Sequence, residues 1–230
     1  MKKIILSSII LLMASFLIVH AGDPSRLGTT SGTQLLIPVG ARALSMGGAP
    51  LGVISGGEAI FWNPAGIAAS SQSEVLFNNM QYIADIDVNY LSLVFNGGNI
   101  GAFGLDIKSL SFGNIDETTE QLPDGTGNTY SPTFIVSGLT YSRRLTDRIN
   151  AGVTGKIVYE SIMETSASTF ALDMGVQYSF GRRLHFGVVM KNVGGKLKYD
   201  GRNLERQYQI QSSSLIADNG FFRGVPLASD

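Results

Sequence analysis

Apolar and polar residues alternate along much of the chain from residue 73 onward. The clearest stretch is 168–180, in which large apolar residues at even positions alternate with small or polar residues at odd positions. A period of two residues is typical of β-strands that present one apolar face. The pattern predicts about eight strands. They are expected near 73–83, 87–96, 100–112, 130–142, 148–160, 168–180, 184–193 and 204–212.

The predicted connections between these strands alternate in length. Tight turns are expected at 96–99, 143–147 and 181–183, and longer polar connections at 113–129, 161–167 and 194–203. Only the first outer connection, around Asp85 and Asp87, is too brief for this scheme. In outer-membrane β-barrels the short turns lie in the periplasm and the long loops face outside. The alternation therefore favours a transmembrane barrel over a soluble β-sandwich, which the strand pattern alone leaves open.

Composition supports a membrane protein without helical spans. Charged residues make up only 15% of the chain and glycine accounts for 28 of 230 residues, whereas soluble domains contain about 25% charged residues and about 7% glycine. No apolar stretch after Ala21 reaches 18 residues, which excludes a helical membrane protein. Aromatic residues near strand ends are expected in the interfacial girdles of a barrel. They are Tyr82, Tyr90, Phe112, Tyr130, Tyr141, Tyr159 and Phe180.

The first 21 residues have the features of a secretory signal peptide. Lys2 and Lys3 precede an apolar run over 4–19, and small residues at Val19 and Ala21 fit a peptidase that cuts after Ala21. The alternative, an uncleaved anchor, is disfavoured because a full span needs about 20 apolar residues. The remaining 209 residues, enough for one domain, carry a net charge of −3 and no cysteine. Nucleic-acid binding, disulfides and thiolate metal sites are not expected.

The segment before the first strand lacks the period-two pattern and is rich in glycine and alanine. Its landmarks are GARALSMGGA at 40–49 and EAIFWNPAGIA at 58–68. These stretches resemble two signatures of the PorV/PorQ group of outer-membrane proteins, which are relatives of the FadL-type channels for hydrophobic substrates. The resemblance implies a FadL-like barrel whose N-terminal segment folds inward and plugs or lines the lumen. We therefore expect a plug segment at 22–72 and a transmembrane barrel at 73–230.

A complete barrel of this family has about fourteen antiparallel strands, within the range of outer-membrane barrels. Because about eight strands are predicted and the chain ends without a terminal aromatic residue, we expect a barrel truncated at its C-terminus. The alternative is a genuine eight-strand barrel, whose interior is filled by side chains and leaves no room for a plug.

The resemblance also implies a function at the outer membrane. PorV-like members serve type IX secretion and handle exported cargo proteins, so secretion components or cargo are the expected partners, together with outer-membrane lipid. The alternative is a FadL-like channel for long-chain fatty acids or other hydrophobic small molecules. An enzyme is a distant third possibility, because no catalytic constellation is found.

The plug signatures are expected to shape the plug, and the alternative is that they contact a ligand directly. Glycines at 47 and 48 allow positive φ, and Asn63 can bond backbone two residues ahead while Pro64 starts a short helical turn at 64–69. A lumenal Arg42 should pair with an inward carboxylate such as Asp106, Asp173 or Glu160. The signature residues are Gly40, Arg42, Met46, Gly47, Gly48, Trp62, Asn63, Pro64 and Gly66.

Arginines gather in two of the predicted periplasmic turns. Arg143, Arg144 and Arg148 belong to one turn, and Arg182 and Arg183 to the other. Solvation and contact with lipid headgroups would account for them. The sharper hypothesis is a docking face for an acidic periplasmic partner of a secretion apparatus.

Catalytic, cofactor and metal sites are not expected. Nucleophilic catalysis needs a base within hydrogen-bond reach, and the mature chain offers only His185. This histidine alternates with apolar Leu184 and Phe186, so it should face the lumen as a polar filler. The stretch 124–128 lacks the spaced acids of a calcium loop.

Overall fold

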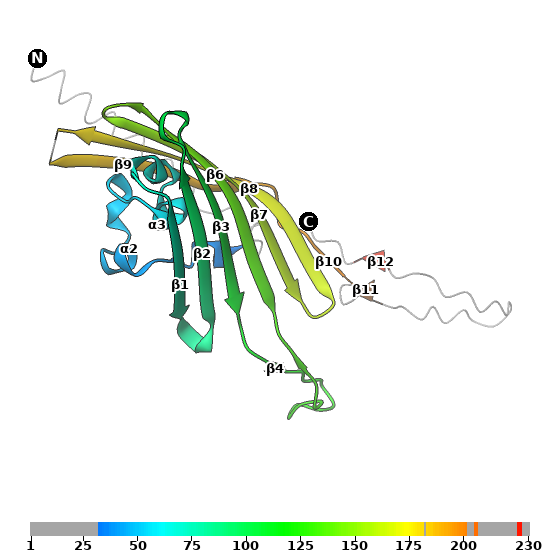
Figure 1. Cartoon of the computed structure of the whole chain (residues 1–230). Helices are drawn as coiled ribbons and strands as arrows, with labels where there is room; N and C mark the ends of the chain where they lie inside the picture. Colours follow the sequence, from blue (N-terminus) through cyan, green and yellow to red (C-terminus); the bar gives the residue numbers. More distant parts are fainter. Residues whose placement is uncertain (1–31, 182, 202–204, 207–224, 227–230) are drawn as a thin grey trace, which may run out of the picture. The chain divides into compact units, whose positions relative to one another are not determined.

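The computed structural model describes residues 32–181, 183–201, 205–206 and 225–226. The predicted signal peptide and its cleavage site after Ala21 lie outside these residues. From Gln34 onward the described chain belongs to one compact unit. In this unit a curved antiparallel sheet carries the short helices of the plug segment on one face (Figure 1).

The main sheet has the strand order β1-β2-β3-β6-β7-β8-β10, and β9 also pairs with β8. All its pairings are antiparallel, so the predicted all-β antiparallel class is confirmed. The sheet is open between β1 and β9 in the described part of the chain. Barrel closure and the final strand number stay predictions. The strands are β1 (Glu74–Gln81), β2 (Asp87–Asn96), β3 (Ala102–Ser111), β6 (Thr133–Thr146), β7 (Ile149–Ile162), β8 (Thr165–Phe180), β9 (Leu184–Gly194) and β10 (Tyr199–Gly201).

Seven predicted strands coincide with β1, β2, β3, β6, β7, β8 and β9. The eighth, at 204–212, lies outside the described residues except for Glu205–Arg206, which form β11 and pair with β12 (Val225–Pro226). The long polar connection predicted at 161–167 is wrong. The β7–β8 ladder continues to the pair Ile162↔Thr165, so only two residues connect these strands. Polar residues there belong to the strand ends, because ladder hydrogen bonds do not require apolar side chains.

The ends of the sheet differ in their connections. The end that includes residues 97–101, 147–148, 181 and 183 has only short turns among the described residues and is called the turn end. The opposite end, called the loop end, includes the connection 112–132, in which β4 (Ile115–Asp116) pairs with β5 (Thr129–Tyr130). The predicted alternation of connection length therefore holds for this loop but not for β7–β8.

The faces of the sheet have opposite character. Side chains on the convex face are large, apolar and exposed, as illustrated by Leu105, Leu139 and Ile157. The concave face buries small, polar and charged side chains, together with one apolar cluster, beneath the plug segment. An apolar belt of this kind is compatible with lipid. Tyr90 is an exception to the predicted aromatic girdle, because it lies on the concave face and is fully buried.

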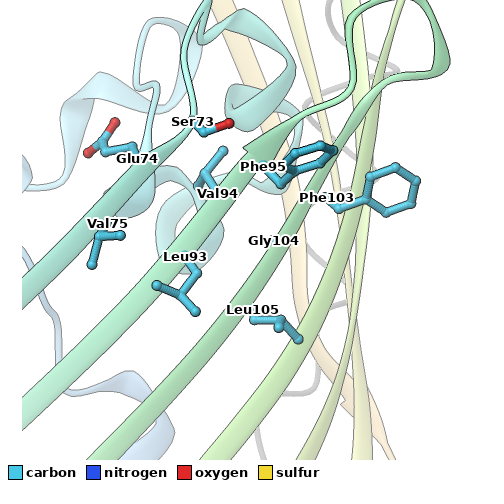
Figure 2. Close-up of a pocket in the computed structure, with 9 residues that line it drawn as sticks. All are labelled: Ser73, Glu74, Val75, Leu93, Val94, Phe95, Phe103, Gly104 and Leu105. Atoms are coloured by element: carbon cyan, nitrogen blue, oxygen red, sulfur yellow. The ribbon is translucent and has the colours of Figure 1, made fainter.

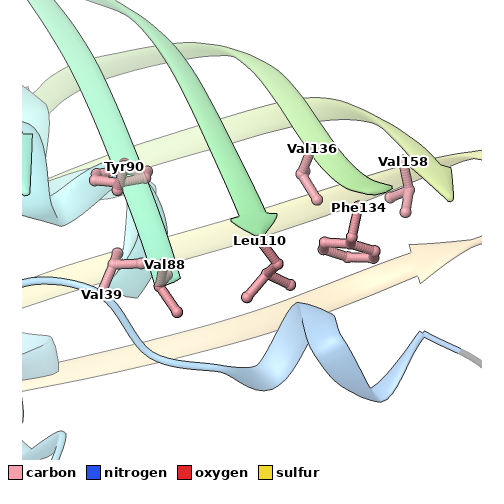
Figure 3. Close-up of a cluster of buried hydrophobic side chains, with 7 residues drawn as sticks. All are labelled: Val39, Val88, Tyr90, Leu110, Phe134, Val136 and Val158. Atoms are coloured by element: carbon pink, nitrogen blue, oxygen red, sulfur yellow. The ribbon is translucent and has the colours of Figure 1, made fainter. Parts of the chain in front are cut away.

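The plug segment consists of short helices that rest on the concave face. They are η3 (Thr33–Leu36), α2 (Ala41–Ser45), η4 (Ala49–Gly52), α3 (Gly57–Trp62) and η5 (Pro64–Ala69), and two single turns, η6 (Ile83–Asp85) and η7 (Gly98–Ile100), lie between strands. A cluster of buried apolar residues joins Val39 of the plug segment to four strands (Figure 3). Its members are Val39, Val88, Tyr90, Leu110, Phe134, Val136 and Val158. No helix of the described residues is long and apolar enough to cross a membrane.

Candidate functional site

The two signatures of the plug segment pack against each other. Gly40 has φ 86°, and a Cβ atom there would lie 2.6 Å from Cδ of Glu58. Gly48 has φ 76°, and a Cβ there would lie 2.8 Å from Cζ3 of Trp62. Both positions require glycine, because positive φ and close approach each disfavour a side chain. The predicted positive φ at Gly47 and Gly48 is confirmed, at 62° and 76°.

Trp62 and Asn63 also hold the plug segment in place through side-chain hydrogen bonds. The indole Nε1 of Trp62 donates to the Val39 carbonyl at 2.8 Å. Asn63 is fully buried, and its Nδ2 donates to the carbonyls of Leu51 at 2.9 Å and Val176 at 3.2 Å. Its Oδ1 accepts from the backbone N–H of Ala65 at 3.2 Å, as predicted, and caps a 3-10 turn that begins at Pro64. Asn63 therefore joins two parts of the plug segment to the sheet.

Other signature residues have simpler surroundings. A Cβ at Gly66 would lie 2.2 Å from the Ile54 carbonyl oxygen, so this glycine permits close packing inside the plug segment. Met46 is exposed. Arg42 is exposed and forms no ion pair with a carboxylate in the described chain. The pairing expected for a lumenal Arg42 is not formed among the described residues, because α2 buries Ala43 and leaves Arg42 exposed.

A trough of glycines on the concave face receives the plug segment. A Cβ at Gly152 would lie 2.5 Å from the Pro64 carbonyl, and one at Gly175 would lie 2.0 Å from Oδ1 of Asn63. Gly152 and Gly175 are direct partners in the β7–β8 ladder. On β9, a Cβ at Gly187 would lie 2.3 Å from the Leu51 carbonyl. The sequence analysis did not identify this trough. Its signal in the sequence is the presence of glycines at inward-facing positions of three adjacent strands, β7, β8 and β9.

Nearer the loop end, charged side chains hold the plug segment. Nζ of Lys108, 2% exposed, donates to the carbonyls of Gln34 at 3.1 Å and Ile37 at 2.6 Å. Gln34 Nε2 in turn donates to Oε1 of Glu160 at 3.0 Å. Lysine suits this role, because its ammonium group has three donors and can bond several carbonyls at once.

A buried ion pair lies beside this contact. Nζ of Lys156 lies 2.7 Å from Oδ2 of Asp173 and 2.6 Å from Oδ1 of Asn192. The β8–β9 ladder shifts register opposite Asp173, and Asn192 adopts φ 59°. This bulge directs the Asn192 N–H to Oδ1 of Asp173 at 2.7 Å. The carboxylate is thus bonded through both oxygens. Such a pair is costly to disrupt, because loss of one partner leaves a buried charge.

Two further charged residues line the same region. Gly138 leaves room for Asp106, because a Cβ at Gly138 would lie 2.3 Å from the Asp106 carboxylate. Oδ1 of Asp106 has no hydrogen-bond partner in the described residues. Lys191 Nζ lies 3.6 Å from the centroid of the Phe61 ring, a cation–π contact that ties β9 to the plug segment.

The enclosed space between the plug segment and the sheet is small. A cavity of about 20 Å³ is lined by residues including Phe61, Asp106 and Lys156, room for about one water molecule. The described residues contain no cluster of three acidic, histidine or cysteine side chains that could hold a metal.

His185 lies on the concave side, as predicted, with its Nδ1 3.1 Å from Oγ of Ser179.

A second hollow lies outside, on the convex face of β1, β2 and β3 (Figure 2). It has a volume of about 350 Å³ and its lining is mainly apolar. The residues that line it are Ser73, Glu74, Val75, Leu93, Val94, Phe95, Phe103, Gly104 and Leu105. Because the plug segment covers the opposite face, this hollow is not continuous with the enclosed cavity in the described residues.

The arginines predicted for periplasmic turns lie at the turn end. Arg143 and Arg144 lie within the last turn-end residues of β6, which continues to Thr146, so the tight turn predicted at 143–147 is shorter than expected; Arg148 follows in the turn to β7. Arg183 lies in the turn between β8 and β9, while Arg182 is outside the described residues. The structure therefore brings four of the five arginines to one end of the sheet.

Comparison with known proteins gives one family. A search of curated proteins finds no match. The family model described as "Type IX secretion system protein PorV" matches residues 20–221, which include the plug segment's signatures and every described strand of the main sheet. The predicted family is confirmed, and with it a place in the outer membrane. This chain belongs to the PorV family of type IX secretion system proteins.

Proposed function

We propose that this protein handles exported cargo proteins at the cell surface for type IX secretion, with its plug segment closed. The family match supports the association with secretion. The observation that carries the proposal is that the plug segment is hydrogen-bonded to the sheet. The fully buried side chain of Asn63 donates to the carbonyls of Leu51 and Val176. A protein closed in this way acts through its outer surfaces and loops.

Displacement of the plug segment would be costly. It would strip hydrogen bonds from Asn63 and Lys108, and each buried polar group left unpaired costs about 1–3 kcal/mol. It would also uncover the buried cluster around Val39 and Phe134. Movement of the plug segment away from the concave face therefore has a high energetic cost. Exposed loops such as 112–132 stay accessible without any such change.

A channel for hydrophobic compounds is the second candidate function. The apolar hollow of about 350 Å³ on β1, β2 and β3 favours it, because this volume suits part of an acyl chain (Figure 2). The hollow opens on the convex face, where membrane lipid is the nearest source of such a chain. It supports contact with lipid more directly than transport.

Crosslinking of the full chain in intact outer membranes tests the proposal. Captured proteins would be identified by mass spectrometry, and bound lipid would be extracted from the purified protein. Recovery of exported proteins supports cargo handling. Recovery of free fatty acid or other hydrophobic compounds without any exported protein would overturn it in favour of a channel.

A reversible lock on the plug segment separates the two functions. The chain has no cysteine, so cysteines introduced at Ala65 and Ser142 meet no competing thiol; Oγ of Ser142 donates to the Ala65 carbonyl at 3.1 Å. We expect the oxidised variant to retain surface display of cargo at the level of the same variant when reduced. Loss of display on oxidation alone would show that the plug segment must move.

A further inference from the structure

The turn end of the sheet carries a concentration of arginines around the plug segment. Arg143, Arg144 and Arg148 flank the β6–β7 turn and Arg183 lies in the β8–β9 turn. The two turns are connected, because the Ser179 N–H donates to the Arg148 carbonyl at 2.8 Å. Antiparallel neighbours are about 4.8 Å apart, so the turns lie roughly two strand spacings from each other. The arginines therefore share one rim.

These arginines carry positive charge that the described residues do not neutralise. All four are exposed, and no carboxylate lies within ion-pair distance of them in the described chain. Asp147 is the one acid in these two turns. Unpaired guanidinium groups close together create a positive potential that attracts carboxylates or phosphates.

The direction of the side chains distinguishes a protein partner from membrane lipid. Alternation along β6 places Ser142 on the buried concave side, and Arg144, two residues on, has the same parity. Arg143 has the opposite parity and follows the lipid-facing Tyr141. Arg143 is therefore positioned for a lipid headgroup, whereas Arg144 points to the side on which the plug segment lies.

The plug segment covers the concave face of the sheet close to the arginines. Helix η5 packs on β6, β7 and β8 near the turn end, where Oγ of Ser142 donates to the Ala65 carbonyl. The last residue of η5, Ala69, is exposed. The end of η5 lies farther along the sheet, because the carbonyl of Ser70 accepts from Nδ2 of Asn96 on β2 at 2.6 Å. A partner at the arginines would thus meet the strand ends of β6, β7 and β8 beneath which η5 is seated.

We propose that the rim formed by Arg143, Arg144, Arg148 and Arg183 is a docking surface for an acidic segment of a periplasmic protein. Carboxylates of that segment would form bidentate pairs with the guanidinium groups. Because short turns of outer-membrane barrels lie in the periplasm, the surface faces the compartment from which exported proteins arrive. The proposal goes beyond cargo handling and holds for a channel as well.

A paired charge reversal tests this surface. The full chain in nanodiscs of zwitterionic lipid would be titrated with a fluorescent deca-glutamate peptide. Arg144→Glu with Arg148→Glu should weaken binding about tenfold or more, and salt should weaken wild-type binding. The matched control is Lys196→Glu with Lys198→Glu, which changes net charge equally at exposed positions beyond β9, toward the loop end. We expect the control to bind within about twofold of wild type.

A photo-crosslinker at Asp147 in intact cells gives the second readout. Crosslinks to a periplasmic protein that disappear in the arginine pair but persist in the lysine pair would support the surface. Equal binding of the peptide by both pairs would overturn the proposal, as would crosslinks to phospholipid alone. Surface display of cargo, measured in the same cells, reports separately on the proposed function.

Discussion

The plug segment is held to the sheet in different ways near the turn end and near the loop end. At the turn end the plug segment lies directly on glycines: the backbone of Pro64 contacts Gly152 and the side chain of Asn63 contacts Gly175, with no space for a Cβ at either glycine. Toward the loop end, the long side chain of Lys108 spans the gap to three carbonyls of the plug segment. The first contact tolerates no added atom, whereas a flexible side chain can adjust. The difference indicates that the turn end fixes the position of the plug segment.

The largest effect is expected from filling the glycine trough. Gly152→Ala together with Gly175→Ala should destabilise the protein by about 4 kcal/mol, since overpacking at each site costs about 1–3 kcal/mol and their neighbours are backbone or buried. Urea unfolding in lipid vesicles would measure this. Trp62 is the sole tryptophan, so its fluorescence reports on the plug segment, and circular dichroism reports on the sheet.

The control for the glycine trough is Gly155→Ala. A Cβ there would lie 3.5 Å from the Phe170 ring, an ordinary contact. We expect a change within about 0.5 kcal/mol, as for substitutions away from tightly packed features. Equal urea midpoints for the double variant and the control would contradict the close contact at the turn end.

Removal of the Asn63 side chain should have the next largest effect. Asn63→Ala leaves Ala65 N–H without its cap and removes a donor from Leu51 and Val176, at a cost of about 3 kcal/mol. Thermal unfolding followed by Trp62 fluorescence would measure it. Asn79→Ala is the matched control, because the bond from Asn79 to Asn89 is exposed, and should cost under about 1 kcal/mol. Equal losses of stability in the two variants would show that Asn63 is not a main contact between the plug segment and the sheet.

The loop-end contact should be weaker. Lys108→Met keeps most of the side-chain volume but removes the donor to Gln34 and Ile37, and we expect a loss of about 2 kcal/mol. Hydrogen exchange of residues 34–39 should increase while that of 63–67 stays protected. Lys198→Met is the control at an exposed position. Simultaneous exchange of both regions would show that the plug segment releases as one unit.

The smallest effect is expected at the hydrogen bond between Gln34 and Glu160. Gln34→Ala should cost about 1 kcal/mol, since one side-chain bond that is partly buried is lost. Its measurement is the same exchange experiment at residues 34–39. A loss larger than that of Lys108→Met would place the main loop-end contact at Gln34 instead of Lys108.

Much of the sheet was predictable, because strand pairing follows local alternation. The apolar even positions of 168–180 predicted both β8 and its outward face, and β2 matches its predicted range at both ends. The 3-10 turn at Pro64 and its Asn63 cap also followed from local chemistry. The connection at 161–167 did not, because polar residues at a strand end look like a loop in sequence while the ladder continues through them.

The sequence by itself determined the strands, the outward apolar face and the family, because these depend on spacing between neighbours in the chain. Only the tertiary structure decided which residues meet across the concave face. A lumenal Arg42 was expected to pair with an inward acid such as Asp173, yet Asp173 pairs with Lys156. Gly175 meets Asn63 although 111 residues intervene. Such contacts depend on how the plug segment is seated on the curved sheet, and no local pattern specifies that seating.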